Sequence, residues 1–92
     1  MPNRHPSAIK RNRQNEKRRE RNRTVRARVK TDVRKVREAV AAQDVPTAES
    51  GLRIAIKELA KAASKGVLHR NAASRRIGRL SKRVAGLKSA AG

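Results

Sequence analysis

The feature that most restricts the fold is a segment of fourteen residues, Lys10 to Arg23, in which no side chain is apolar. It holds eight cations and two glutamates, a net charge of +6. A helix formed here has no face to bury in a core, and its cations repel one another. We therefore expect residues 1–23 to form a basic arm that projects from the domain, frays when free and becomes ordered on a polyanion. The eight cations are Lys10, Arg11, Arg13, Lys17, Arg18, Arg19, Arg21 and Arg23.

The spacing of apolar residues predicts three helices and no strands. No Gly or Pro occurs from Ala8 to Ala42, which predicts one long first helix. Its second half carries valines three or four residues apart, on one helical face. Two further stripes follow, the last with heptad-like spacing. The expected core positions are Val25, Val29, Val33, Val36 and Val40, then Leu52, Ala55, Ile56, Leu59 and Ala63, then Ala73, Ile77, Leu80, Val84 and Leu87.

Capping residues predict the helix boundaries. Asp44, with Pro46 two residues later, is typical of an N-cap and a first helical turn. We expect this second helix to end near Ser64, because Gly66 is a typical C-terminal stop. The third helix is expected to begin within residues 69–71.

We expect the third helix to end near Leu87. Connections as short as these make neighbouring helices antiparallel. The sequence therefore predicts an all-α fold, a three-helix antiparallel bundle with a long, projecting N-terminal helix. Residues 1–92 are expected to form a single domain, with the bundle at 24–88 and its core capped by Val67 and Leu68.

Charge indicates the kind of partner. Lys and Arg number 26 against 7 Asp and Glu, a net charge of +19 in 92 residues. A compact chain this basic is typical of proteins that bind a polyanion, with nucleic acid the leading candidate and an anionic membrane surface the competitor. The basic arm lacks the bulky apolar anchors of a membrane-surface helix, and no run approaches the roughly 18 apolar residues of a span. No signal peptide is expected, and we expect a cytoplasmic protein with no membrane partner.

The absence of Phe, Tyr and Trp limits how nucleic acid could be recognised. Domains that bind splayed bases stack them on aromatic rings. We therefore expect contacts with the backbone, the grooves and the overall shape of the nucleic acid.

A second basic surface is expected on the third helix. Its cations stand near one side, and residues 66–92 contain no acid to pair with them. His69 and Asn71, in the preceding turn, are candidates for a structural hydrogen bond or for backbone contact. The cations of this surface are Arg75, Arg79, Lys82 and Arg83, flanked by Arg70 and Arg76.

Catalytic and metal-binding patterns are not found. The chain has no Cys, and its histidines are His5 and His69 alone, so no metal or other cofactor is expected. Asp32 lies among cations and is expected to be an ion-pair partner. No phosphate-binding loop or nucleophile motif occurs, and we expect neither an enzyme nor a small-molecule substrate.

The order of these motifs resembles the S-twenty family of bacterial small-subunit ribosomal proteins. The similarity begins in residues 7–19, continues through 24–30 and covers nearly the whole chain. It is closest at Ala63, Lys65-Gly66, His69, Asn71, Arg75-Arg76 and Arg79-Leu80. The sequence departs from the family at Ser74, Ile77 and Gly78, where alanine, lysine and serine are usual.

The resemblance implies a three-helix protein with a long first helix that binds 16S ribosomal RNA directly and aids assembly of the small (30S) subunit. Its implied partners are 16S ribosomal RNA, neighbouring ribosomal RNA helices and other small-subunit proteins. The implied contacts are Lys10, Arg11, Arg13, Lys17, Arg18, Arg19, His69, Asn71, Arg75, Arg76 and Arg79, to which the basic pattern adds Arg21, Arg23 and Arg83.

These observations together predict a structural RNA-binding protein of the ribosome. Lysine and arginine would neutralise phosphates and release counterions, and RNA shape would supply specificity. The alternative is a nucleoid-type DNA-binding protein, which would use the same phosphate chemistry and bind any duplex DNA with similar affinity.

Overall fold

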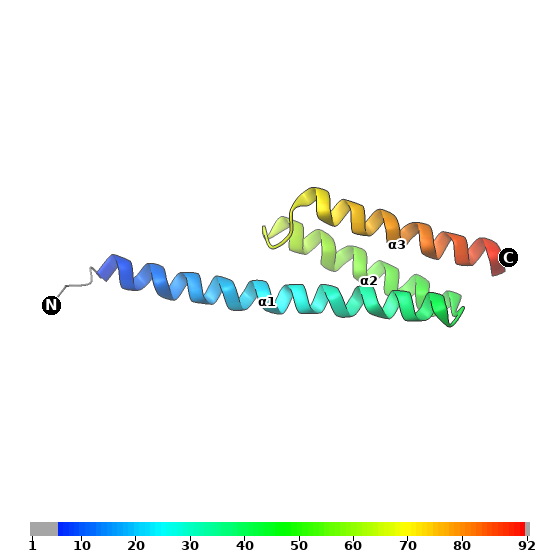
Figure 1. Cartoon of the computed structure of the whole chain (residues 1–92), viewed down its shortest axis with the longest axis horizontal. Coiled ribbons are helices and arrows are strands. Elements are labelled where there is room, and N and C mark those ends of the chain that lie inside the picture. Colours follow the sequence, from blue (N-terminus) through cyan, green and yellow to red (C-terminus); the bar gives the residue numbers. More distant parts are fainter. Residues whose placement is uncertain (1–5, 92) are drawn as a thin grey trace.

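The computed structural model describes residues 6–91 as three helices, α1 (Pro6–Ala41), α2 (Val45–Ser64) and α3 (Arg70–Ala91), with no strand among these residues. α2 runs back along the C-terminal half of α1, and α3 turns again and runs along α2 (Figure 1). The N-terminal half of α1 extends beyond the bundle, so the molecule measures 71 × 21 × 14 Å. The predicted fold, an all-α three-helix bundle with a long first helix, is confirmed.

α1 is a single helix of 36 residues, about 54 Å long at 1.5 Å per residue. Pro6 begins it, at a position where the missing N–H group is not needed. α2 covers only the second half of α1, where the valine stripe lies. The side chains of residues 8–21 are all exposed, as expected for a segment with nothing to bury.

The turn before α2 follows the predicted capping pattern. Asp44 is the N-cap, and its Oδ1 accepts a hydrogen bond from the Thr47 backbone N–H at 3.3 Å. Its Oδ2 accepts from the Thr47 hydroxyl at 2.6 Å. Gln43, at φ 58°, supplies the left-handed residue that ends α1, a role that glycine usually fills.

The turn before α3 contains the expected glycine. Gly66 has φ 77° and donates to the Ala63 carbonyl at 3.1 Å, which ends α2 as predicted. His69 then precedes α3, and its Nδ1 accepts a hydrogen bond from the Asn71 backbone N–H at 3.1 Å. The ring thus satisfies one of the free N–H groups at the helix start.

α3 continues to Ala91, four residues beyond the predicted end at Leu87. The predicted end was wrong because it was placed at Leu87, the last residue of the apolar stripe, and a helix can continue beyond its apolar stripe. Lys88, Ser89 and Ala90 are exposed, so the helix continues there without burying a side chain. Lys88 Nζ instead lies 3.0 Å from Glu49 Oε1 and joins the end of α3 to the start of α2.

The core consists of aliphatic side chains from all three helices and from Val67. Every predicted stripe position except Ile56 is buried or packed against the buried cluster, and Ile56 is half-buried outside it. Val67 is buried and Leu68 packs beside it, as predicted for a cap. Three buried alanines were missed, because alanine is equally common on exposed helix faces. They are Ala39, Ala48 and Ala62.

Gly51 marks the closest approach of α1 and α2. A Cβ atom built there would lie 3.2 Å from Cγ2 of Val36, a side chain that is fully buried. We expect Gly51→Val to lower the free energy of unfolding by about 1–3 kcal/mol, because the core cannot move aside without strain. Urea denaturation measures this. The control is Gly78→Val, because a Cβ atom built at Gly78 would meet no atom within 4 Å beyond its own stretch of helix. This change should alter the free energy of unfolding by only a few tenths of a kcal/mol. Equal losses at both sites would contradict the close approach of α1 and α2.

Candidate nucleic-acid interface

A groove of about 790 Å³ runs between α1 and α3. α2 makes most of the contacts with both of these helices, and α1 touches α3 over a shorter stretch, which leaves the groove open along one side of the bundle. Its apolar lining residues are Val29, Val33, Leu68 and Leu80. Its charged lining residues are all basic, Arg26, Lys30, Arg34 and Arg37 from α1 and Arg76, Arg79 and Arg83 from α3.

The sequence of α1 places four of these cations beside the core. Each follows one of the stripe valines, as in Val25-Arg26 and Val29-Lys30. A step of one residue turns the helix by about 100°, so a cation directly after a core residue emerges at the edge of the packed face. On α3, the spacing of three and four residues from Arg76 to Arg83 forms the opposite wall.

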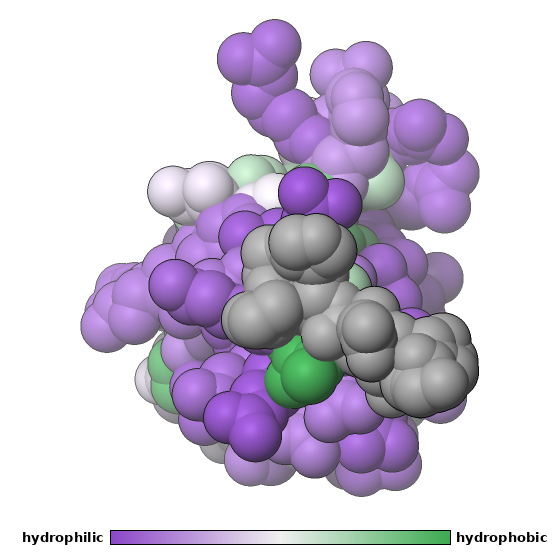
Figure 2. Space-filling model, turned by 90° about the vertical axis from the view of Figure 1, so that its left-hand side faces the viewer, coloured by the Kyte–Doolittle hydropathy of each residue, from purple (hydrophilic) through white to green (hydrophobic). Residues whose placement is uncertain are grey.

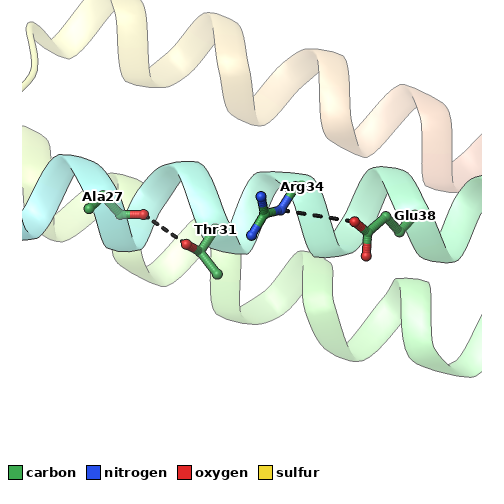
Figure 3. Close-up of polar contacts among 4 residues, drawn as sticks. All are labelled: Ala27, Thr31, Arg34 and Glu38. Atoms are coloured by element: carbon green, nitrogen blue, oxygen red, sulfur yellow. Dashed lines mark hydrogen bonds and ion pairs between the residues drawn. The ribbon is translucent and has the colours of Figure 1, made fainter.

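One groove cation has a nearby acid. Arg34 Nε lies 3.9 Å from Oε1 of Glu38, one turn further along α1 (Figure 3). Their side chains are 68% and 70% exposed, so water screens the pair and it contributes little to stability. Because the pair with Glu38 is weak, Arg34 remains available to an anion. In the same view, the Thr31 hydroxyl donates to the Ala27 carbonyl at 3.0 Å, which is a contact within the helix.

A second hollow, of about 520 Å³, follows the arm. Arg26 lines both this hollow and the groove, and its Nη2 donates to the Val67 carbonyl at 3.4 Å. This long hydrogen bond links the α2–α3 turn to α1 where the arm leaves the bundle. Together the two hollows form a continuous basic track from Asn15 to Arg37, about 33 Å of helix. The lining residues of the second hollow are Asn15, Arg18, Arg19, Asn22, Arg23 and Arg26.

The structure distributes the predicted arm residues around the whole of α1. All eight arm cations are exposed. Arg18, Arg19 and Arg23 line the second hollow. At about 100° per residue, the others fall on different sides of the helix. The remaining five are Lys10, Arg11, Arg13, Lys17 and Arg21.

The predicted residues of α3 divide into two groups. Arg76, Arg79 and Arg83 line the groove, whereas Arg75 is exposed outside its lining. His69 and Asn71 lie exposed at the start of α3. Because His69 Nδ1 accepts a hydrogen bond there, the neutral ring carries its proton on Nε2, which is the nitrogen left to donate to a partner.

Four groove cations of α1 were missed by the prediction of site residues. The valine stripe indicates a packing surface in that half of the helix, and the sequence does not show that the cations beside it line a groove. The signal that could have found them is the repeated valine–cation pair. The missed residues are Arg26, Lys30, Arg34 and Arg37.

Asp32 does not form the predicted ion pair. It has no cationic partner among residues 6–91, and its Oδ2 is buried without a hydrogen bond to any of them. Over the same residues, no three His, Cys, Asp or Glu side chains gather as a metal site requires. His5 lies outside the described residues.

The surface around the arm is mainly hydrophilic. Viewed from the end where the arm begins, polar residues cover most of the molecule and hydrophobic patches are isolated (Figure 2). No helix in the described part of the chain is both long and apolar enough to cross a membrane.

The three helices differ sharply in charge. α1 carries fourteen Lys and Arg against four acids, α3 carries seven and no acid, and α2 carries only three against two. α2 is also the helix that packs against both others. A nearly neutral helix therefore holds two strongly basic helices side by side, and a polyanion gains most on the side where α1 and α3 meet.

Comparison with known proteins identifies the family. The profile of ribosomal protein S20 matches residues 3–85. The small ribosomal subunit protein bS20 of Anaeromyxobacter dehalogenans is 60% identical over 79 residues, 86% of each chain. The bS20 protein of Beutenbergia cavernae is 53% identical over 81 residues, 88% of this chain and 94% of its own. The chain therefore belongs to the ribosomal protein S20 family, which confirms the resemblance seen in the sequence and the prediction of a structural ribosomal protein rather than an enzyme.

Proposed function

We propose that this chain is a structural constituent of the small ribosomal subunit that binds 16S ribosomal RNA directly and aids assembly of the subunit. The observation that carries the proposal is the continuous basic track from the arm into the groove between α1 and α3. Seven cations from two helices face one groove, and no acid lines it. The names of the bS20 relatives supply the cellular context.

The mechanism is electrostatic. An RNA backbone lying in the groove would be contacted from the α1 wall and the α3 wall at once. Each phosphate neutralised by Lys or Arg releases counterions, which favours binding at low salt. Arginine can also bind phosphate through two parallel N–H groups, and six of the seven groove cations are arginines. The arm adds reach, because it presents cations beyond the end of the bundle.

Affinity measured across a salt series tests the choice of partner. We expect 16S ribosomal RNA to retain a clear advantage over transfer RNA and over duplex DNA as salt rises, because contacts with RNA shape persist when phosphate contacts are screened. If all three nucleic acids bound with similar affinity and one common slope, the protein would be a general polyanion binder, as the nucleoid-type hypothesis requires.

A groove variant tests where the RNA lies. We expect Lys30→Gln, Arg79→Gln and Arg83→Gln together to reduce the slope of log affinity against log salt by about 2–3, because each lost phosphate contact removes about 0.7–0.9. The matched control removes three exposed cations from α2, with Arg53→Gln, Lys57→Gln and Lys61→Gln. The control should change the slope by less than about 1; an equal reduction in both variants would count against the groove.

A further inference from the structure

The face of the arm that continues the core stripe is polar rather than apolar. Arg11, Asn15, Arg18 and Asn22 lead up to Val25 at steps of three or four residues. At about 100° per residue, these four lie within about 60° of the line of core valines. We call them the inner face of the arm. By this period they lie on the same side of α1 as the core valines, which pack against the rest of the bundle. The arm extends past the α2–α3 turn (Figure 1). The inner face and this turn therefore form a corner.

The acids of α1 mark the opposite side. Glu16, Glu20 and Glu38 lie roughly opposite the core stripe at about 100° per residue. The fourth acid, Asp32, is half-buried within the bundle. The inner face carries no acid, and two exposed cations lie nearby, Lys65 in the α2–α3 turn and Arg70 at the start of α3. A polyanion is thus attracted to the corner more strongly than to the outer side of the arm.

Asn22 occupies the innermost point of the corner. It is half-buried, whereas residues 8–21 and Arg23 are exposed. Its Oδ1 is enclosed and has no hydrogen-bond partner among residues 6–91. An enclosed acceptor without a donor is unfavourable. A rotation of the carboxamide about χ2 would turn this oxygen outward, toward whatever binds in the corner.

The chemistry of the inner face indicates what that partner is. Arginine and lysine only donate hydrogen bonds, so they bind phosphates of RNA and DNA alike. Asparagine both donates and accepts, as does the ribose 2′-hydroxyl. In A-form RNA these hydroxyls line a minor groove that is wide and shallow enough for a helix to lie against. Alternating arginine and asparagine along one face suits a surface that presents phosphates and 2′-hydroxyls together.

We propose that an RNA double helix lodges in this corner with its minor groove against the inner face of the arm. Asn15 and Asn22 contact 2′-hydroxyls, and Arg11 and Arg18 contact the phosphates that flank them. The inference rests on the proposed function and adds to it the form of the RNA, the groove presented and the residues that separate RNA from DNA.

The test uses the full chain and two probes, a short RNA duplex and the same duplex with fluorine in place of every 2′-hydroxyl. The fluorinated duplex keeps the A-form but cannot donate from the 2′ position. We expect the unmodified protein to bind the hydroxylated duplex about tenfold more tightly, the effect of one or two hydrogen bonds. Asn15→Ala with Asn22→Ala should abolish most of this preference. Asn15→Ala alone, at an exposed position, should reduce it if the double variant does not fold.

Asn12→Ala is the matched control, because Asn12 is an exposed asparagine of the arm outside the inner face. It should retain the full preference. The proposal is overturned if the unmodified protein does not distinguish the two duplexes, if the Asn15 variants retain its preference, or if Asn12→Ala loses as much. Loss of the advantage of 16S ribosomal RNA over transfer RNA would instead overturn the proposed function, so the two failures are separate.

Discussion

Replacing Leu80 with aspartate should unfold the bundle. Leu80 is 3% exposed and belongs to the buried cluster that joins the three helices. Removing its side chain lowers the free energy of unfolding by about 2–5 kcal/mol, and an unpaired buried carboxylate adds several kcal/mol more. A domain of this size has a total stability of about 5–14 kcal/mol. Far-UV circular dichroism should show the loss of most helical signal, and thermal melting should lose its cooperative transition.

Ile54→Asp is the matched control for this prediction. Ile54 is also a large aliphatic residue on a helix, but it is 53% exposed on the outer side of α2. Its replacement should change stability by roughly 0.5 kcal/mol or less, as is usual for surface positions. If Leu80→Asp melted like the unmodified protein, the placement of α3 against the other two helices would be wrong. If both variants unfolded, general intolerance to acidic residues rather than burial would be the cause.

The helices could be predicted from the sequence because their signals are local. Asp44 caps α2 through Thr47, three residues away, and Gly66 ends α2 through its own backbone conformation. The valine stripe of α1 needs only the helical period to predict a packing face. Each of these features depends on residues within one or two turns of each other, so a single sequence suffices.

The groove could not be predicted in the same way, because it depends on how two helices cross. Nothing in the sequence of α1 says whether Lys30 faces α3, solvent or α2. That answer comes from the close packing of α1 on α2 at Gly51 and from the thinner contact between α1 and α3. The end of α3 escaped prediction because no apolar stripe marks its last residues, and the burial of Ala48 escaped it because alanine is equally common on exposed helix faces.

The division of charge explains why the fold needs its middle helix. α1 and α3 are both strongly basic and repel each other across the groove. α2 carries Glu49 and Glu58, and Glu49 pairs with Lys88 of α3 at 3.0 Å. Apolar packing on α2 therefore has to outweigh a repulsion that bound RNA would relieve. We infer that RNA stabilises the bundle as well as being bound by it, since a ligand that binds only the folded chain raises its stability.

Deleting residues 1–23 should weaken binding to 16S ribosomal RNA on the order of 10³-fold at moderate salt, if half of the eight arm cations each contribute about 1 kcal/mol of charge-assisted contact. The slope of log affinity against log salt should fall by about 3–4 for the same four contacts. Because no described side chain of residues 8–21 is buried, residues 24–92 should remain helical with a cooperative melt. Filter binding across a salt series and circular dichroism of the truncated chain provide both measurements.

The loss of affinity caused by deleting residues 1–23 shows whether the arm takes part in RNA binding. If the arm frays when free, binding has to order it, at about 1–2 kcal/mol of backbone entropy per residue, and part of the contact energy is spent on folding. A proline at Gln14 raises that ordering requirement further, because it breaks the helix without changing a charge. Gln14→Pro should then weaken binding by an intermediate factor with an unchanged salt slope. If instead the truncated chain bound 16S ribosomal RNA as tightly as the full chain, the arm would have no part in binding, and the groove between α1 and α3 would account for the affinity alone.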